Sequence, residues 1–233
     1  MTILLTGASG KLGTELNRNE NYLTPTSQEL DIRSVGLVTE FARRYSFVNK
    51  VIHCAAYTNV PAAETNRKEA IETNIIGAKN IKQEFPQAKI IYVSSDYVYE
   101  GISGNYKETD QPKPFNFYGF TKLAGESFLD IKKDLIIRTS FKPSVWPYDG
   151  AFCDLFTSAD YVDVIAQKIK LLINSSLTGI INVGTERKSI YNLASRRNAN
   201  VKAITTDNIT SVNLPKDISM CIDRFNEFER GLK

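Results

Sequence analysis

The sequence predicts an α/β protein in which helices cover both faces of a doubly wound parallel sheet. Short apolar segments alternate with segments of helical periodicity between Thr2 and Thr139. These apolar segments are continuous instead of alternating with polar residues, which is typical of parallel strands that are buried on both faces. The chain has 233 residues, of which 42% are hydrophobic, so it is long enough to bury a sizeable core.

The strands are predicted where apolar, mostly β-branched residues cluster over a few positions, as in the segments TILLT and KIIYVS. In order along the chain they are Thr2–Thr6, a short strand around Tyr22–Thr24, Lys50–Ala55, Lys89–Ser94, Asp134–Thr139 and Gly179–Gly184.

Between these strands, apolar residues recur at the three- and four-residue spacing of a helix. The clearest case is the last one, which places Val162, Ile165, Ile169 and Leu172 on one face. The predicted helices are Lys11–Asn17, Arg67–Glu84, Tyr118–Ile131 and Asp160–Asn174.

Two Pro-containing segments interrupt this alternation. Tyr106–Pro114 is polar and is expected to be a loop, and Lys142–Gly150 is expected to leave the sheet. From about Thr185 onward the alternation of strands and helices is lost. We therefore predict a main domain over residues 1–141, to which 159–184 return, and a small lobe made of 142–158 and 185–233.

A glycine-rich loop follows the first strand and opens the first helix, in the order TGASGKLG. Gly7 would permit the tight turn, Gly10 the close approach of a pyrophosphate, and Gly13 the packing of helix on strand. The free N–H groups at the start of the helix would face the phosphates. This context predicts a Rossmann fold that binds a dinucleotide.

The preference between NADH and NADPH depends on the residues after the second strand. NAD-binding sites usually carry an acid there for the ribose 2′-hydroxyl, and no acid directly follows Tyr22–Thr24. Lys11, inside the loop, would be able to meet a 2′-phosphate. The sequence thus favours NADPH over NADH.

A tyrosine and a lysine, Tyr118 and Lys122, lie four residues apart and share one face of a predicted helix. An ammonium group near a phenol is expected to lower its pKa toward the range of acid–base catalysis. Ser94, Ser95 and Asp96 follow a strand at the carboxyl edge of the sheet, where such folds bind ligands. Glycine loop, serine and tyrosine–lysine pair occur in the order that a hydride-transfer site needs.

These motifs resemble the extended short-chain dehydrogenase/reductase superfamily and, within it, the dTDP-4-dehydrorhamnose reductase family. The matching segments are TGASGKLG, LDIRS, CAAYTNV, SSDYVYEG, YGFTKLAGE and RTS, and they span Thr6 to Ser140.

The resemblance implies the roles of individual residues. Ser95 would be the catalytic hydroxyl, Tyr118 the proton donor, and Lys122 the residue that binds the nicotinamide ribose and lowers the pKa of the tyrosine. The residues implied at the cofactor are Gly7, Ser9, Gly10, Lys11, Leu12, Gly13, Asp31, Ile32, Ala55, Ala56, Tyr57 and Lys122. The residues implied at the substrate are Asp96, Tyr97 and Phe141.

The chain departs from the family pattern at several positions. His53 stands where the family often has Asn, and we expect it to be a buried structural residue. Phe141 follows RTS, where the family has Trp. Leu214 stands where the family has an Arg that would hold the substrate diphosphate, and the lobe is short. The basic residues that would be able to replace this Arg are Lys142, Arg187, Lys188 and Lys216.

Composition excludes several other classes of protein. The net charge of +3 is too small to indicate binding to nucleic acid, and no apolar run is long enough for a membrane helix. The N-terminus does not resemble a signal peptide. The three cysteines are too scattered for a disulfide framework or a metal site, which favours a cytoplasmic protein with reduced thiols and no metal. The oligomeric state is left open, a homodimer included.

Three functions therefore remain. The first is an NAD(P)H-dependent reductase of a nucleotide-activated 4-keto-6-deoxy sugar, which Tyr97 after Asp96 favours over a 4,6-dehydratase. The second is a sugar-nucleotide epimerase or another carbonyl reductase on the same scaffold. The third is a non-catalytic, NAD(P)-binding regulatory subunit, because the fold alone does not decide function.

Overall fold

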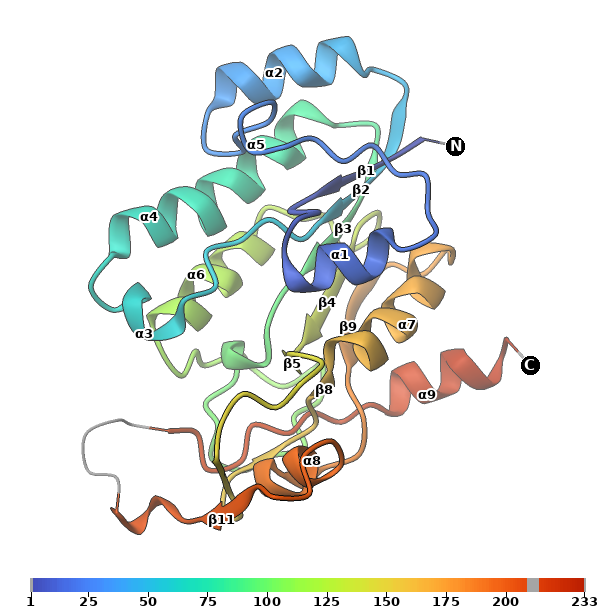
Figure 1. Cartoon of the computed structure of the whole chain (residues 1–233). Helices are drawn as coiled ribbons and strands as arrows, with labels where there is room; N and C mark the ends of the chain where they lie inside the picture. Colours follow the sequence, from blue (N-terminus) through green and yellow to red (C-terminus); the bar gives the residue numbers. More distant parts are fainter. Residues whose placement is uncertain (1, 209–213, 233) are drawn as a thin grey trace.

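The computed structural model describes residues 2–208 and 214–232. A parallel sheet lies at its centre, with the strand order β1-β2-β3-β4-β9 (Figure 1). The strands are β1 (Thr2–Thr6), β2 (Val48–His53), β3 (Lys89–Val93), β4 (Leu135–Thr139) and β9 (Gly179–Val183). The α/β fold with a parallel sheet is thus confirmed.

The strand expected around Tyr22–Thr24 is reduced to a single bridge between Leu23 and Leu4 of β1. The backbone of Leu23 donates to Ile3 and accepts from Leu5, both at 2.9 Å. Pro25 follows, and it has no N–H with which to extend a ladder. The chain thus visits one side of β1 before it forms β2 on the other, which makes the carboxyl end of β1 a topological switch point.

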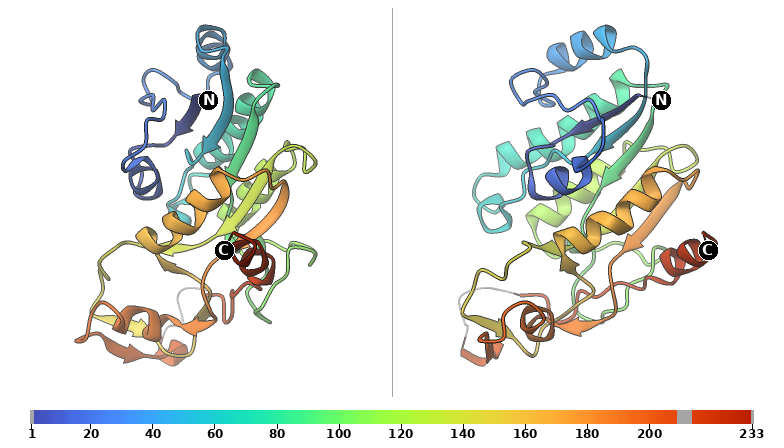
Figure 2. Two further views of the ribbon diagram at one scale, coloured as in Figure 1. Left: turned by 90° about the vertical axis from the view of Figure 1, so that its right-hand side faces the viewer. Right: turned by 45° about the vertical axis from the view of Figure 1, so that its right-hand side comes forward.

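Helices cover both faces of the sheet (Figures 1 and 2). On one face lie α1 (Lys11–Asn17) and α7 (Val162–Ile173), and on the other lie α2 (Val35–Arg44), α5 (Gly77–Glu84) and α6 (Phe117–Glu126). Successive strand residues divide between the two faces, as the pleat requires. Ile3 and Leu5 enter the cluster beneath α1 and α7, whereas Leu4 enters the cluster beneath α2 and α5.

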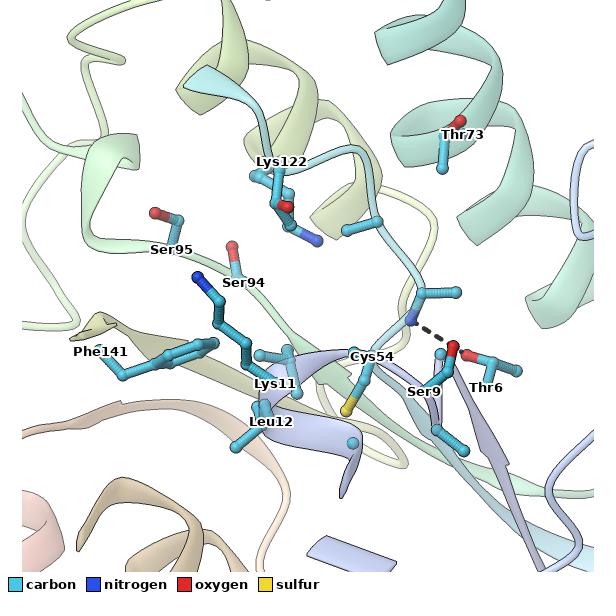
Figure 3. Close-up of a pocket in the computed structure, with 18 of the residues that line it drawn as sticks. Thr6, Ser9, Lys11, Leu12, Cys54, Thr73, Ser94, Ser95, Lys122 and Phe141 are labelled. Atoms are coloured by element: carbon cyan, nitrogen blue, oxygen red, sulfur yellow. Dashed lines mark hydrogen bonds between the residues drawn. The ribbon is translucent and has the colours of Figure 1, made fainter. Parts of the chain in front are cut away.

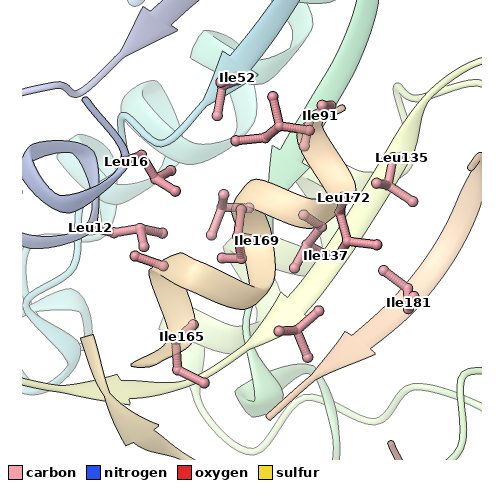
Figure 4. Close-up of a cluster of buried hydrophobic side chains, with 14 of the residues drawn as sticks. Leu12, Leu16, Ile52, Ile91, Leu135, Ile137, Ile165, Ile169, Leu172 and Ile181 are labelled. Atoms are coloured by element: carbon pink, nitrogen blue, oxygen red, sulfur yellow. The ribbon is translucent and has the colours of Figure 1, made fainter. Parts of the chain in front are cut away.

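The first cluster contains the apolar stripe that the sequence predicts for α7. Ile165, Ile169 and Leu172 are fully buried and lie against Ile137 and Ile181 of the sheet (Figure 4). Burial of an aliphatic side chain of this size stabilises a fold by about 1.5–3 kcal/mol. This cluster fixes α7 and α1 across the strands whose ends carry the candidate site.

Two predicted helices differ in detail from the structure. The segment 67–84 is one helical stretch, but it consists of α4 (Arg67–Ile71), the π-helical turn η1 (Glu72–Ile76) and α5. Helix α6 ends at Glu126 and not at Ile131, because Asp130 starts a turn in which its N–H donates to the Asp134 carboxylate. A further short helix, α3 (Val60–Ala63), follows β2.

Below the sheet, the chain forms pairs of short strands (Figure 1). The pairs are β5 (Phe141–Lys142) with β8 (Asp160–Tyr161), β6 (Gly150–Phe152) with β11 (Lys202–Ile204), and β7 (Phe156–Thr157) with β10 (Lys188–Ser189). The remaining elements are the 3-10 turns η2 (Asp96–Val98) and η3 (Thr206–Asn208) and the helices α8 (Ile190–Ser195) and α9 (Asp223–Arg230).

The division into a main domain and a lobe stays a prediction, to which the structure adds one detail. Helix α9 follows the lobe in sequence, yet it packs beside β9 and buries Phe225 in the cluster beneath α7 (Figure 2). Over the described ranges, 2–208 and 214–232, none of the helices has the length and apolar character needed to cross a membrane.

Candidate functional site

A cleft of about 840 Å³ opens at the carboxyl ends of β1, β2, β3 and β4. Each strand contributes the residues that follow it, because the carboxyl ends of parallel strands meet at one edge of the sheet. Gly7 follows β1, Cys54 and Ala55 follow β2, Ser94 follows β3, and Ser140 follows β4. Helix α6 closes the cleft with Tyr118 and with Lys122, of which Figure 3 shows the lysine.

At Gly7 and Gly13 the backbone packs so closely against neighbouring backbone atoms that a side chain would not fit. Gly7 adopts a φ of +69°, and a Cβ there would lie 2.6 Å from the backbone nitrogen of Ala55. A Cβ on Gly13 would lie 2.2 Å from the Gly7 carbonyl oxygen. At Gly10 a Cβ would meet only that same oxygen, at 3.2 Å. The loop is therefore open toward the cleft, as a backbone that approaches a pyrophosphate requires.

Polar side chains fix the wall of the cleft beyond β2. Thr6 Oγ1 lies 2.8 Å from Nδ1 of His53 and accepts a hydrogen bond from the N–H of Ala55 (Figure 3). His53 is 1% exposed and stacks on Tyr92. Burial and the charge of Lys122 lower the pKa of His53 to about 3, so the ring is neutral. These contacts fit the structural role expected of His53.

The π-helical turn places Asn74 against the same wall. Its side-chain oxygen accepts from the N–H of Tyr57, and its nitrogen donates to the Tyr57 carbonyl and to Thr121 Oγ1 of α6. π-Helical turns occur frequently at functional sites. Here the turn ties the loop after β2 to the helix that carries Tyr118 and Lys122.

Lys122 is 2% exposed, and its Nζ lies 4.2 Å from the centre of the Tyr92 ring. Burial lowers the pKa of this ammonium to about 8, and Glu126 and Cys54 act in the opposite direction. A group with this pKa remains mostly protonated near neutral pH. Lys122 is thus a cation inside the cleft.

The pKa of Tyr118 differs from the expectation. It is raised and not lowered, because the surroundings of the phenol exclude water and because Asp96 is close, while a hydrogen bond with Ser95 opposes the rise. The prediction that Lys122 draws this pKa downward is wrong for this structure, in which the lysine ammonium lies over Tyr92. A raised pKa keeps the phenol protonated at neutral pH, which suits a proton donor.

A buried ion pair holds α6 against the sheet. Glu126 receives two hydrogen bonds from Arg138 of β4, at 3.1 and 2.7 Å, and one from the Ser94 hydroxyl. Arg138 also donates to the Tyr99 hydroxyl, and both members of the pair are at most 6% exposed. Tyr118, Lys122 and Glu126 are spaced four residues apart and share one face of α6. The ion pair therefore fixes the position of the helix face that carries Tyr118 and Lys122.

A second cavity, of about 480 Å³, adjoins the cleft on the side of the lobe. Asp96, Tyr97, Ser140 and Lys142 line both spaces. Asp96 is 3% exposed, and burial raises its pKa to about 6 although Lys142, Ser140 and Ser95 oppose the rise.

The four basic residues considered as replacements for an Arg have different surroundings. Lys142 lines both spaces. Arg187 pairs with Asp217 at 2.7 Å and lies over the Phe156 ring. Lys188 is buried and donates to two carbonyl groups and the Thr185 hydroxyl, and Lys216 is exposed and does not line either space.

The cleft brings together nearly all of the predicted site residues. Tyr57 is the exception, because its side chain does not line the cleft. Phe141 lines the cleft but not the second cavity, whereas Asp96 and Tyr97 line both. The predicted residues found on the cleft wall are Gly7, Ser9, Gly10, Lys11, Leu12, Gly13, Asp31, Ile32, Ala55, Ala56, Ser95, Asp96, Tyr97, Tyr118, Lys122 and Phe141.

Two cations on this wall differ from the expectations of the sequence analysis. Arg33 is not among the predicted site residues, and Lys11 is predicted to meet a 2′-phosphate. Arg33 lines the cleft beside Asp31, with which it forms hydrogen bonds of 2.8 to 3.2 Å. Arg33 directly follows Asp31 and Ile32, which are predicted to lie at the cofactor, and this position in the sequence is the signal that could have identified it. Lys11 extends toward Ser94 and Ser95, which follow β3 (Figure 3). Among the described residues there is no cluster of three or more potential metal ligands.

Comparison with known proteins identifies the family of the chain. Residues 1–168 match the RmlD substrate binding domain, so the chain belongs to this family, and the resemblance seen in the motifs is confirmed. The dTDP-4-dehydrorhamnose reductase of Mycobacterium tuberculosis is 31% identical over 177 residues, which are 70% of this chain and 54% of that protein. The chain thus spans about half the length of the curated relatives it matches.

Other similar proteins show the range of functions on this fold. The crystal structure of a dTDP-4-dehydrorhamnose reductase from Bacillus anthracis, in complex with NADP, has a TM-score of 0.83 and 28% identity over 98% of this chain and 92% of that one. The methionine adenosyltransferase 2 subunit beta of Xenopus tropicalis is 33% identical over 53% of this chain and 41% of that protein.

Proposed function

We propose that this chain is an NAD(P)H-dependent reductase of a nucleotide-activated 4-keto-6-deoxy sugar, with Tyr118 as the proton donor. One observation carries the proposal. A single cleft joins the glycine loop after β1 to Ser95, Tyr118 and Lys122, and it continues into a second cavity that would hold a substrate. The reductases among its relatives support the substrate class.

The residues of the cleft fit a nicotinamide dinucleotide. Gly10 exposes its backbone to the cleft, and the volume of about 840 Å³ lies in the range of cofactor sites. Arg33 replaces Lys11 as the residue that would meet a 2′-phosphate, because an Arg near this acid position serves NADP in such folds. A bound reduced nicotinamide would supply the hydride.

The protein's own groups would handle the oxygen of the substrate. The Tyr118 phenol, protonated because of its raised pKa, would donate its proton to the carbonyl oxygen as that atom gains negative charge. The Ser95 hydroxyl donates to the Asp96 carboxylate at 3.1 Å in this structure. With substrate bound, it would turn its single O–H to the same oxygen. Lys122 would contribute positive charge and bind the nicotinamide ribose.

The test measures oxidation of NADPH and of NADH with a panel of dTDP-, UDP-, GDP- and CDP-4-keto-6-deoxy sugars. We expect consumption of the reduced cofactor that depends on one sugar. Tyr118→Phe should lower kcat by about 10²- to 10⁴-fold while the Kd of the cofactor stays nearly unchanged. Tyr45→Phe, at the end of α2 and away from the cleft, is the matched control. Full activity in Tyr118→Phe would contradict the assignment.

Two other functions give different results in the same assay. An epimerase returns its cofactor to the starting state, so net consumption of NADPH excludes it. A regulatory subunit is supported by the similarity to methionine adenosyltransferase 2 subunit beta. It would bind the cofactor with no turnover of any sugar.

A further inference from the structure

Lys142 occupies the junction between the cleft and the second cavity. It lies on the two-residue strand β5, where it pairs with Tyr161 of β8, so its backbone is fixed. Its neighbours at the junction, Asp96, Tyr97 and Ser140, also line both spaces. A group bound in the second cavity and reaching toward Ser95 would therefore have to pass Lys142.

The second cavity has almost no charge of its own. Asp96 and Lys142 are its two charged residues among the described parts of the chain, and both lie at the junction. Leu214 occupies its wall, and the segment 209–213 before it, ITSVN, contains no basic residue. Most of the uncharged residues of the wall are aromatic or aliphatic, such as Trp146, Phe152, Phe156, Ile190 and Ile218.

The ammonium of Lys142 is available to a ligand. Within the described ranges it forms no hydrogen bond and no ion pair within 4.0 Å, although an ammonium has three donors. Burial lowers the pKa of Lys142, the attraction of Asp96 opposes this decrease, and the nearby charge of Lys11 adds to it. Two ammonium groups that repel one another across a cleft make a favourable place for an anion.

From this arrangement we infer that Lys142 binds the phosphate groups of a nucleotide-linked substrate and is the residue that selects for them. The inference rests on the proposed sugar-nucleotide reductase. A diphosphate entering an apolar cavity loses its hydration and requires a cation to replace it. Arg187 and Lys188 are held by other partners, and Lys216 lies outside the cavity. Lys142 is thus the cation that the second cavity offers.

The experiment uses nucleoside diphosphates as probes. Binding of dTDP, UDP, GDP and CDP is measured by calorimetry with the wild-type chain and with Lys142→Met, which keeps the length of the side chain and removes its charge. For the diphosphate that the wild type binds most tightly, we expect Kd to rise about 10- to 100-fold, as for loss of a hydrogen bond to a charged group. Lys216→Met, which removes an exposed lysine of the same lobe, should bind like the wild type.

The remaining measurements separate the explanations. An unchanged Tm shows that Lys142→Met folds normally. A Kd for the diphosphate equal to that of the wild type overturns the inference. The inference is also overturned if Lys142→Met weakens binding of NADPH and not of the diphosphate, because Lys142 would then belong to the cofactor site. Absence of any binding of a nucleoside diphosphate to the wild type also overturns it.

Turnover distinguishes this inference from the proposed function. If the wild type reduces a sugar nucleotide and Lys142→Met shows the same KM, the inference is wrong and the reductase stands. If no sugar nucleotide is reduced, yet diphosphate binding depends on Lys142, the reductase is wrong and the phosphate site stands.

Discussion

The edge of the sheet and the lobe beneath it are built in different ways. The sheet consists of five parallel strands whose ends deliver the residues of the cleft. The lobe consists of strand pairs of two or three residues, such as β7 with β10 and β6 with β11. The cleft carries cations and acids along its wall, whereas the described residues of the second cavity carry charge only where it meets the cleft.

This difference separates the two tasks of the site. Chemical groups that must keep a fixed geometry come from the sheet edge and α6, where buried polar contacts such as Glu126–Arg138 hold them. The lobe contributes a mostly apolar cavity, which under the proposed function would hold the substrate. Substitutions in the sheet half should therefore have larger effects on folding than equivalent substitutions in the lobe.

The loss of folding stability should differ most between the sheet half and the lobe when an ion pair is broken. Glu126→Gln leaves Arg138 as an uncompensated charge in the interior and should destabilise the fold by about 3–5 kcal/mol. Arg187→Ala in the lobe breaks the pair with Asp217, but Arg187 is half exposed, so the loss should be at most about 1 kcal/mol. Denaturant unfolding of both variants measures the difference. Equal losses would show that the two regions are held equally tightly.

Asp96, at the boundary between the regions, should give a pH-dependent stability. Its folded-state pKa of about 6 lies above the ordinary value of 3.8, so the folded state binds the proton more tightly. The stability from this group is present below about pH 4 and is lost as the pH rises through 6. Asp96→Asn should therefore exceed the wild type by roughly 2–3 kcal/mol at pH 8 and match it at pH 4. A gain of equal size at both pH values would contradict the raised pKa.

The loss of folding stability should differ least between the two regions when a glycine is replaced by alanine. Gly13→Ala places a Cβ 2.2 Å from the Gly7 carbonyl oxygen, so the loop must shift, and we expect a loss of about 1–3 kcal/mol together with weaker cofactor binding. In Gly150→Ala, in the lobe, the new Cβ would lie 3.3 Å from the Ile204 side chain, which is able to move, and 3.6 Å from the Lys202 carbonyl oxygen, an ordinary van der Waals contact. Its effect should stay within about 0.5 kcal/mol. Thermal unfolding and titration with NADPH test both variants.

Part of the structure could not be read from local patterns. Helix α2 was not predicted, although Ser34 caps its start and Val38 and Phe41 form its buried face. The sequence predicts a strand around Tyr22–Thr24, but in this segment only Leu23 pairs with the sheet, through an isolated bridge to Leu4 of β1. The segment 185–233 is predicted to form part of the lobe, and within it Phe225 of α9 is buried in the cluster beneath α7. In each case the outcome depends on packing against residues far away in the sequence.

The sequence by itself determined the parallel sheet and nearly all of the cleft. Continuous apolar strands, the glycines and the spacing of Tyr118 and Lys122 are local features, and the carboxyl edge of a parallel sheet brings together whatever follows its strands. The tertiary structure alone decided the electrostatics. Four features depend on burial and on neighbours from distant segments: the raised pKa of Tyr118, the place of Lys122 over Tyr92, the pair Glu126–Arg138, and the Lys142 ammonium, which has no partner among the described residues. Charge interactions depend on distance and on exclusion of water, and spacing along the chain specifies neither.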